Sequence, residues 1–140
     1  MQLSEELARL FANLGPAFAR LGDDGLRNAD YLVLAWLDNR MALDGVRLSD
    51  LAEARGYDIS TMSRRVAHLV GAGLVERQPD PDDGRAQLLV ITRAGRALVA
   101  QGRTRRVSLI TETLDDWSEE DKDQLARLLS RLNQNLELSL

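Results

Sequence analysis

The chain has 140 residues, of which 44% are hydrophobic, 29% charged and 4% aromatic, a composition typical of one globular domain with an aliphatic core. The chain has no cysteine and a single histidine, His68. This composition excludes disulfides, thiol nucleophiles and zinc ribbons, and we expect no cofactor. The longest apolar run, residues 31–37, is too short to span a membrane, and Glu5 and Glu6 precede any basic residue. We therefore expect no signal peptide and a cytoplasmic protein.

Charge is unevenly distributed along the chain. Residues 1–54 contain 9 acidic residues and 5 arginines, whereas residues 55–106 contain 5 acidic residues and 10 arginines. Residues 107–140 are acidic again, with 8 acidic and 3 basic residues. A basic middle between two acidic ends indicates one surface that meets a polyanion.

The first two predicted helices differ in character. Ser4, followed by two glutamates, predicts the start of an amphipathic helix, which Gly15 and Pro16 are expected to bend or break. The segment 22–25, with two glycines around two aspartates, predicts a turn. A second helix over residues 29–38 is apolar nearly all round, so we expect it to be buried.

A pair of short helices follows the loop around Asp44. Ser49 is predicted to cap a helix over residues 50–55, which Gly56 ends. Two residues later, Asp58 is placed to cap another helix. The pattern is helix, tight turn, helix.

The second helix of this pair has two distinct faces. The side expected to face the core carries Ile59, Met62, Val66, Leu69 and Val70. The opposite side carries Ser60, Thr61, Arg64 and His68, with Ser63 and Arg65 flanking. The exposed face is therefore polar, cationic and nearly free of acidic residues.

A two-stranded wing is predicted next. Gly73 is expected to stop the helix, and residues 74–78 alternate as a strand. An acidic, turn-rich loop over residues 79–84 leads to a returning strand over residues 87–91.

Two long helices complete the chain. Thr92 is predicted to cap a helix that runs to about residue 116, and Ser118 begins the last helix. That helix carries a leucine stripe, Leu125, Leu128, Leu129, Leu132 and Leu136. Such a stripe needs a partner, and together with the first helix it predicts an intertwined homodimer.

Several segments resemble, in order and spacing, the MarR (multiple antibiotic resistance regulator) family of winged helix-turn-helix transcription factors. They are LSDLA at 48–52, DISTMSRRV at 58–66, Leu69 with GLVER at 73–77, DGR at 83–85 and VITRAG at 90–95. Within this resemblance, Arg27 and Asp30 stand where the family usually has Thr and Gln, and Gly15 with Pro16 interrupts a helix that is often continuous.

The resemblance implies a mainly α fold with a small β-wing. Residues 1–140 would form a single domain, with a winged helix-turn-helix region at 28–92 and helical dimerisation regions at 1–22 and 93–140. The implied function is that of a sequence-specific transcriptional regulator of double-stranded DNA, not an enzyme. The family is typified by homodimeric repressors that bind a pseudo-palindromic operator and are released by a small aromatic or lipophilic effector.

The resemblance also implies which residues meet DNA. Those placed in the major groove are Ser60, Thr61, Ser63, Arg64 and Arg65, while Arg85 at the wing tip enters the minor groove. Physical chemistry points the same way, because a helix fits the major groove, arginine pairs with guanine, and a narrow minor groove attracts a cation. The alternative for the arginines is a merely solvated helix face.

The predicted DNA-binding set is completed by His68, Arg77 and Asp83. His68, at the far end of the polar face, either contacts phosphate or is simply exposed; one histidine without cysteine makes a poor metal site. Asp83 is expected to hold Arg85 or Arg77 by a charge-assisted hydrogen bond and so preset the wing. The acidic loop lacks the ligand spacing of a calcium loop, so no metal is expected.

An effector pocket is a weaker prediction. Its candidate lining residues are Phe11, Phe18, Tyr31 and Trp36. Apolar side chains at helical spacing more often belong to a core than to a pocket.

One alternative function comes from another class. The chain could be a helical protein-interaction module whose arginine-rich face binds an acidic protein partner. An enzyme that uses paired carboxylates is disfavoured, because no acidic pair lies on a predicted pocket wall beside an orienting base.

Overall fold

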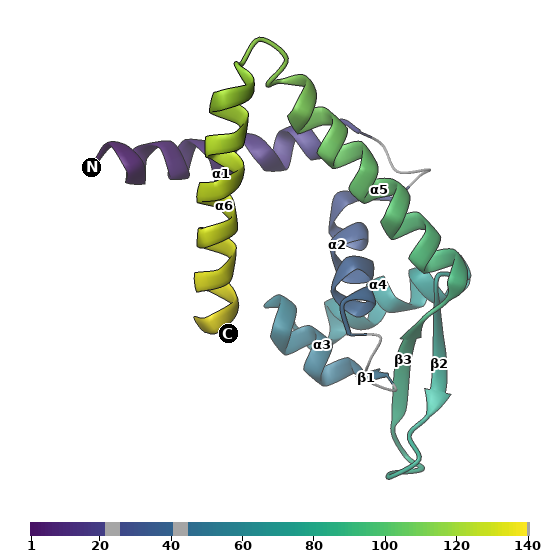
Figure 1. The fold of residues 1–140 in the computed structure, drawn as a ribbon. Coiled ribbons are helices and arrows are strands. Elements are labelled where there is room, and N and C mark those ends of the chain that lie inside the picture. Colours follow the sequence, from purple (N-terminus) through teal and green to yellow (C-terminus); the bar gives the residue numbers. More distant parts are fainter. Residues whose placement is uncertain (22–25, 41–44, 140) are drawn as a thin grey trace. The chain divides into compact units, whose positions relative to one another are not determined.

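The computed structural model describes residues 1–21, 26–40 and 45–139 (Figure 1). Its elements are α1 (Gln2–Ala19), α2 (Asn28–Asp38), β1 (Val46–Arg47), α3 (Leu48–Arg55), α4 (Ile59–Gly71), β2 (Val75–Pro79), β3 (Gln87–Ile91), α5 (Arg93–Glu112) and α6 (Glu119–Ser139). The chain divides into two compact units, residues 1–105 and 106–140, with the boundary inside α5. The predicted mainly helical fold with a small β-sheet is confirmed.

The core of the first unit is built from α2, α3, α4, the sheet and the first part of α5. α2 contributes Tyr31, Val33, Leu34 and Leu37, so the prediction that this helix is buried is confirmed. The largest fully buried side chains of the other elements are Leu51, Met62, Val66, Leu69, Val75 and Val99. This aliphatic core holds α3 and α4 against the sheet and so fixes which face of α4 meets solvent.

The predicted helix-turn-helix is confirmed in α3 and α4. Gly56 ends α3 in the left-handed conformation, with φ of 70°, which favours glycine. Asp58 then caps α4, because its Oδ1 accepts the backbone N–H of Thr61 at 2.7 Å. The prediction for Ser49 is wrong: α3 begins at Leu48, and the N-cap residue is Arg47. β1 ends at Arg47, so the chain becomes helical directly where strand pairing stops.

The β-sheet has three antiparallel strands in the order β1-β3-β2. In the wing, the hairpin of β2 and β3, Val75 pairs with Ile91 and Pro79 with Gln87. β1, which pairs Val46 with Leu89, was not predicted, because two residues are too few to show an alternating pattern.

α1 corrects two predictions. The helix begins at Gln2, with Met1 as its N-cap residue, so Ser4 is not the cap, and it runs unbroken through Pro16. A proline removes one backbone donor and crowds the preceding residue, but Gly15 has no Cβ to clash with the proline ring. The predicted turn at 22–25 and the loop residue Asp44 lie outside the described residues.

The predicted starts of the last two helices are confirmed. The hydroxyl oxygen of Thr92 accepts the N–H of Gly95 at 3.0 Å and donates to the carbonyl of Gly73 at 2.7 Å. In the second unit, the hydroxyl oxygen of Ser118 accepts the N–H of Asp121 at 3.1 Å. α5 ends at Glu112, a few residues before the predicted position, because turns occupy the segment between α5 and α6.

The apolar stripe of α6 faces solvent within the single chain. No residue of α6 is buried, and Leu128 and Leu132 are 52% and 44% exposed. Among the described residues, no helix is both long and apolar enough to cross a membrane.

Gly95 allows close approach of α5 to the segment between α4 and β2 and to the end of β3. An added Cβ would collide with the carbonyl oxygen of Leu74 and lie 2.7 Å from Ile91 Cγ1. We therefore expect Gly95→Ala to lower the free energy of unfolding by about 1–3 kcal/mol, the usual cost of overpacking. The matched control is Gly71→Ala, where an added Cβ meets nothing within 4 Å. Urea denaturation measures both variants, and equal midpoints would contradict the close contact at Gly95.

Candidate nucleic-acid interface

α4 presents one face to the core and another to solvent. Met62, Val66 and Leu69 are buried, as predicted. Ile59 departs from the prediction, since it is 57% exposed. It is the first residue of the helix, and its position on the apolar face does not bury it.

The solvent-facing side of α4 is polar and carries no acidic side chain. Ser60, Arg64 and His68 are exposed, while Thr61 and Ser63 are partly buried. The Ser60 hydroxyl donates to Asp58 Oδ1 at 2.8 Å, so it belongs to the helix cap. Arg64 forms no ion pair with any residue in the described part of the chain. The predicted face is thus present, with Arg64 as its available cation.

The capping carboxylate at the start of this face is ionised over a wide pH range. The backbone N–H of Thr61 and the Ser60 hydroxyl donate to Asp58 and lower the pKa of its carboxyl group, and the positive charge of Arg64 adds to the effect. A carboxylate with a lowered pKa stabilises the folded state above its unfolded pKa of about 3.9 and loses that contribution as pH falls through the folded pKa.

Removal of the Asp58 cap is expected to cost stability in a pH-dependent way. The melting temperature of Asp58→Ala should fall below that of the wild type at neutral pH. The gap should narrow only below the ordinary aspartate pKa of about 3.9, as the pH falls through the lowered pKa of the folded Asp58 carboxyl group. Asp58→Asn is the control, because asparagine caps a helix without titrating. Thermal melts from pH 7 to pH 3 measure the gap, and a constant gap for Asp58→Ala would contradict the assignment.

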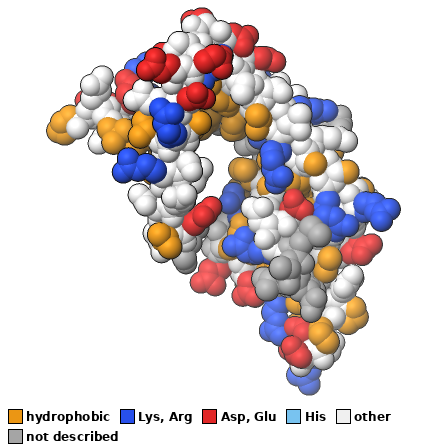
Figure 2. Space-filling model, in the orientation of Figure 1, with side chains coloured by type: hydrophobic (Ala, Val, Ile, Leu, Met, Phe, Trp, Pro, Cys, Tyr) orange, Lys and Arg blue, Asp and Glu red, His pale blue; other side chains and the backbone are white. Residues whose placement is uncertain are grey.

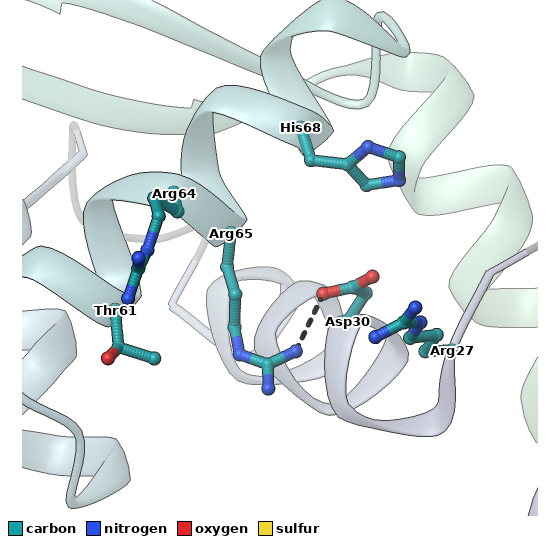
Figure 3. Close-up of a pocket in the computed structure, with 6 residues that line it drawn as sticks. All are labelled: Arg27, Asp30, Thr61, Arg64, Arg65 and His68. Carbon is teal, nitrogen blue, oxygen red and sulfur yellow. Dashed lines mark hydrogen bonds and ion pairs between the residues drawn. The ribbon is translucent and has the colours of Figure 1, made fainter.

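Arg65 extends toward α2 instead of into solvent. Its Nη1 lies 3.1 Å from Asp30 Oδ1. Figure 3 shows the Arg65 side chain directed at Asp30, while Arg64 extends away from that pair. A hollow of about 470 Å³ opens here, and the residues that line it are Arg27, Asp30, Thr61, Arg64, Arg65 and His68.

The wing contributes two further exposed arginines. Arg77 lies on β2 and Arg85 in the turn before β3. A second hollow, of about 280 Å³, brings both of them next to Ser63 of α4. The arginines of the wing therefore lie close to Ser63, which flanks the polar side of the helix.

Two acidic residues shape the wing, and only one of them was predicted. Asp83 Oδ1 accepts the backbone N–H of Arg85 at 3.0 Å, so it fixes the turn and not the guanidinium, contrary to expectation. Asp80 holds an arginine instead: Arg47 Nη2 and Nε lie 2.7 Å and 3.1 Å from Asp80 Oδ2.

The Asp80 pair ties the loop between β2 and β3, at its first residue, to the strand before α3. The buried carboxylate also accepts the N–H of Asp82 at 2.9 Å. This backbone donor and the Arg47 guanidinium lower the pKa of Asp80, so the pair stays charged at neutral pH. The sequence did not reveal it because 33 residues separate the two partners.

The four candidate effector residues lie in different surroundings. Phe11 is exposed on α1 and Phe18 is partly buried. Tyr31 belongs to the core. The ring of Trp36 is covered by the Arg40 guanidinium, whose Cζ lies 3.6 Å from the ring centroid.

The surface charge follows the segments of the sequence. Figure 2 shows acidic side chains around the turn between α5 and α6. In the same view, basic side chains at the tip of the wing lie beside acidic ones. The wing is therefore of mixed charge, and the solvent-facing side of α4, which carries no acidic side chain, is the better surface for a polyanion.

Comparisons with known proteins agree on one family. The sequence model of the MarR family matches residues 24–86. An uncharacterised HTH-type transcriptional regulator of Bacillus subtilis, YxaD, is 36% identical over 108 residues, which cover 77% of this chain and 73% of that protein.

Two solved structures share the fold. A probable transcriptional regulator from Pseudomonas aeruginosa is 27% identical, with a TM-score of 0.64 over 94% of this chain and 96% of that one. An S. aureus MepR mutant bound to an oligodeoxyribonucleotide is 20% identical, with a TM-score of 0.71 over 96% and 97% of the two chains. At that identity the second likeness concerns the fold alone.

Proposed function

This chain belongs to the MarR family of DNA-binding transcriptional regulators, and on that premise we propose that it reads double-stranded DNA with α4 and the wing. The observation that carries the proposal is the solvent-facing side of α4, which has hydroxyls, an arginine without an ion-pair partner among the described residues, and no acidic side chain. Residues 28–92 would bind DNA, and residues 1–22 and 93–140 would join two subunits.

Each part of the proposed interface suits a different part of the duplex. Arg64 projects from a helix, which fits the major groove, and its guanidinium can pair with guanine through two hydrogen bonds. Thr61, Ser63 and His68 surround it and suit phosphate or base contacts. Arg85, in the turn of the wing, suits a narrow minor groove.

A homodimer is the second part of the proposal. In the single chain, α1 and α6 each have an exposed apolar side. It consists of the leucine stripe on α6 and of Leu3, Leu10 and Phe11 on α1. A second copy supplies matching surfaces, and two-fold symmetry places two α4 helices on one duplex.

The third part is repression that ends when a small aromatic or lipophilic molecule binds. Trp36 supports it, because Trp36 and Arg40 line a cavity of about 500 Å³, which Asp50, Asp80 and Asp82 line as well. An aromatic wall beside groups of both charges suits an aromatic molecule with polar substituents. Tyr31, in contrast, packs in the core.

Duplex titration at several salt concentrations tests the DNA function against the acidic-partner alternative. We expect affinity for a random duplex to fall steeply with salt, because cations that contact phosphate release counterions. An excess of poly-glutamate should compete poorly. Binding to poly-glutamate without binding to duplex would favour the protein-interaction module instead.

A further inference from the structure

An ion pair joins the DNA-facing helix to α2. Asp30, in the first turn of α2, is 7% exposed, and Arg65 of α4 is 26% exposed. Arg65 Nη1 lies 3.1 Å from Asp30 Oδ1. Because both side chains are largely shielded from solvent, loss of one partner leaves the other charge shielded and unpaired, which costs more than breaking a surface pair.

A second contact also holds the Arg65 guanidinium. Its Cζ lies 5.1 Å from the centroid of the Tyr57 ring, in the turn between α3 and α4. Its Nε is buried and makes no hydrogen bond in the structure. Arg65 is thus held between α2 and the helix-turn-helix corner, whereas its neighbour Arg64 is exposed.

We propose that Arg65, with Asp30, is a positioning residue: the buried core side chains of α4 choose the face that meets solvent, and the ion pair adjusts the rotation of α4 within that packing and thereby the direction in which Arg64 meets the bases. Successive residues of an α-helix point about 100° apart, so a helix that keeps Arg65 on Asp30 keeps Arg64 on the solvent side. The inference rests on the proposed DNA-reading function. It replaces the expectation that Arg65 itself lies in the major groove.

Direct contact of Arg65 with a phosphate makes opposite predictions. If Arg65 bound phosphate, removal of Asp30 would free the guanidinium and leave DNA binding unchanged or tighter. If Arg65 positions α4, loss of either Arg65 or Asp30 should lower the preference for the selected DNA site to the same extent. A double-mutant cycle separates the two cases.

The experiment compares wild type, Asp30→Asn, Arg65→Gln and the double variant on a selected DNA site and on random duplex. We expect each single variant to lose about tenfold in the ratio of its affinities for the selected site and for random duplex. The double variant should lose the same amount, because the first substitution has already broken the Arg65–Asp30 pair. The salt dependence of binding to random duplex should stay at the wild-type slope. Asp38→Asn, which removes the α2 partner of Arg103 on α5, is the matched control and should keep wild-type discrimination.

Melting temperatures show whether each variant is folded. If a single variant unfolds because one charge is left buried, the neutral double variant carries the test, since it leaves no uncompensated charge. Wild-type discrimination in the double variant would overturn the proposal. So would unchanged binding by Asp30→Asn together with a salt slope lowered by about one in Arg65→Gln. If wild type binds no duplex, the proposed function fails instead.

Discussion

Replacement of Leu128 and Leu132 with glutamate is expected to produce monomers that no longer bind the operator. Both leucines are about half exposed in the single chain and lie one helical turn apart on α6. In a dimer closed by this stripe, the variant would bury four unpaired carboxylates, each of which costs several kcal/mol without a partner. Without the dimer, only one α4 helix reaches the DNA, and affinity falls by orders of magnitude.

Sedimentation velocity measures the change, and circular dichroism confirms that the helices remain. The matched control carries glutamate at Ser130 and Gln134, which have the same spacing but lie on the opposite side of α6. The control should sediment as the wild type does. A dimer of unchanged size in the Leu128 and Leu132 variant would show that the stripe is not the interface.

Arg64→Ala is expected to weaken binding to the best site by about 1–3 kcal/mol and to relax the preference at particular base pairs. Arg64 is exposed on α4 and forms no ion pair in the described part of the chain, although its charge interacts with the capping Asp58 carboxylate. A guanidinium bound to a guanine edge contributes affinity only where that guanine is present. Specificity should therefore fall together with affinity.

Arg85→Ala should act differently. Its guanidinium, in the wing, responds to the width of the minor groove more than to its hydrogen-bonding pattern. Loss of Arg85 should weaken binding and flatten the preference only at the outer flanks of the site. Arg127→Ala, which removes one charge from α6 away from the leucine stripe, is the control.

Sequence selection with wild type and the three variants distinguishes these roles. The docking described here would be wrong if Arg85→Ala altered the inner bases while Arg64→Ala left them unchanged. If neither change affected DNA binding in a folded dimer, the DNA-reading assignment itself would fail.

The features that the sequence predicted correctly are local ones. Asp58, Thr92 and Ser118 each cap a helix within three residues of chain, and Gly56 ends one through its own backbone conformation. Such signals depend on a few neighbouring residues, so they can be identified without tertiary contacts. The polar face of α4 was predictable for a similar reason, since helical periodicity places its members together.

The features that sequence analysis missed depend on contacts between distant segments. β1 is defined only by its pairing with β3. Partners 33 and 35 residues apart form the Arg47–Asp80 and Arg65–Asp30 pairs. Periodicity correctly placed Arg65 beside the polar face, but it could not show that α2 offers a carboxylate there.

Selection of bound fragments from a random duplex library tests the central claim most directly. Two α4 helices related by a two-fold axis predict a pseudo-palindromic motif whose half-sites are about one helical turn, roughly 10 base pairs, apart. Recovery of such a motif, with its inner bases lost in Arg64→Ala, is the expected result. A motif without dyad symmetry, or no enriched sequence at all, would contradict the account.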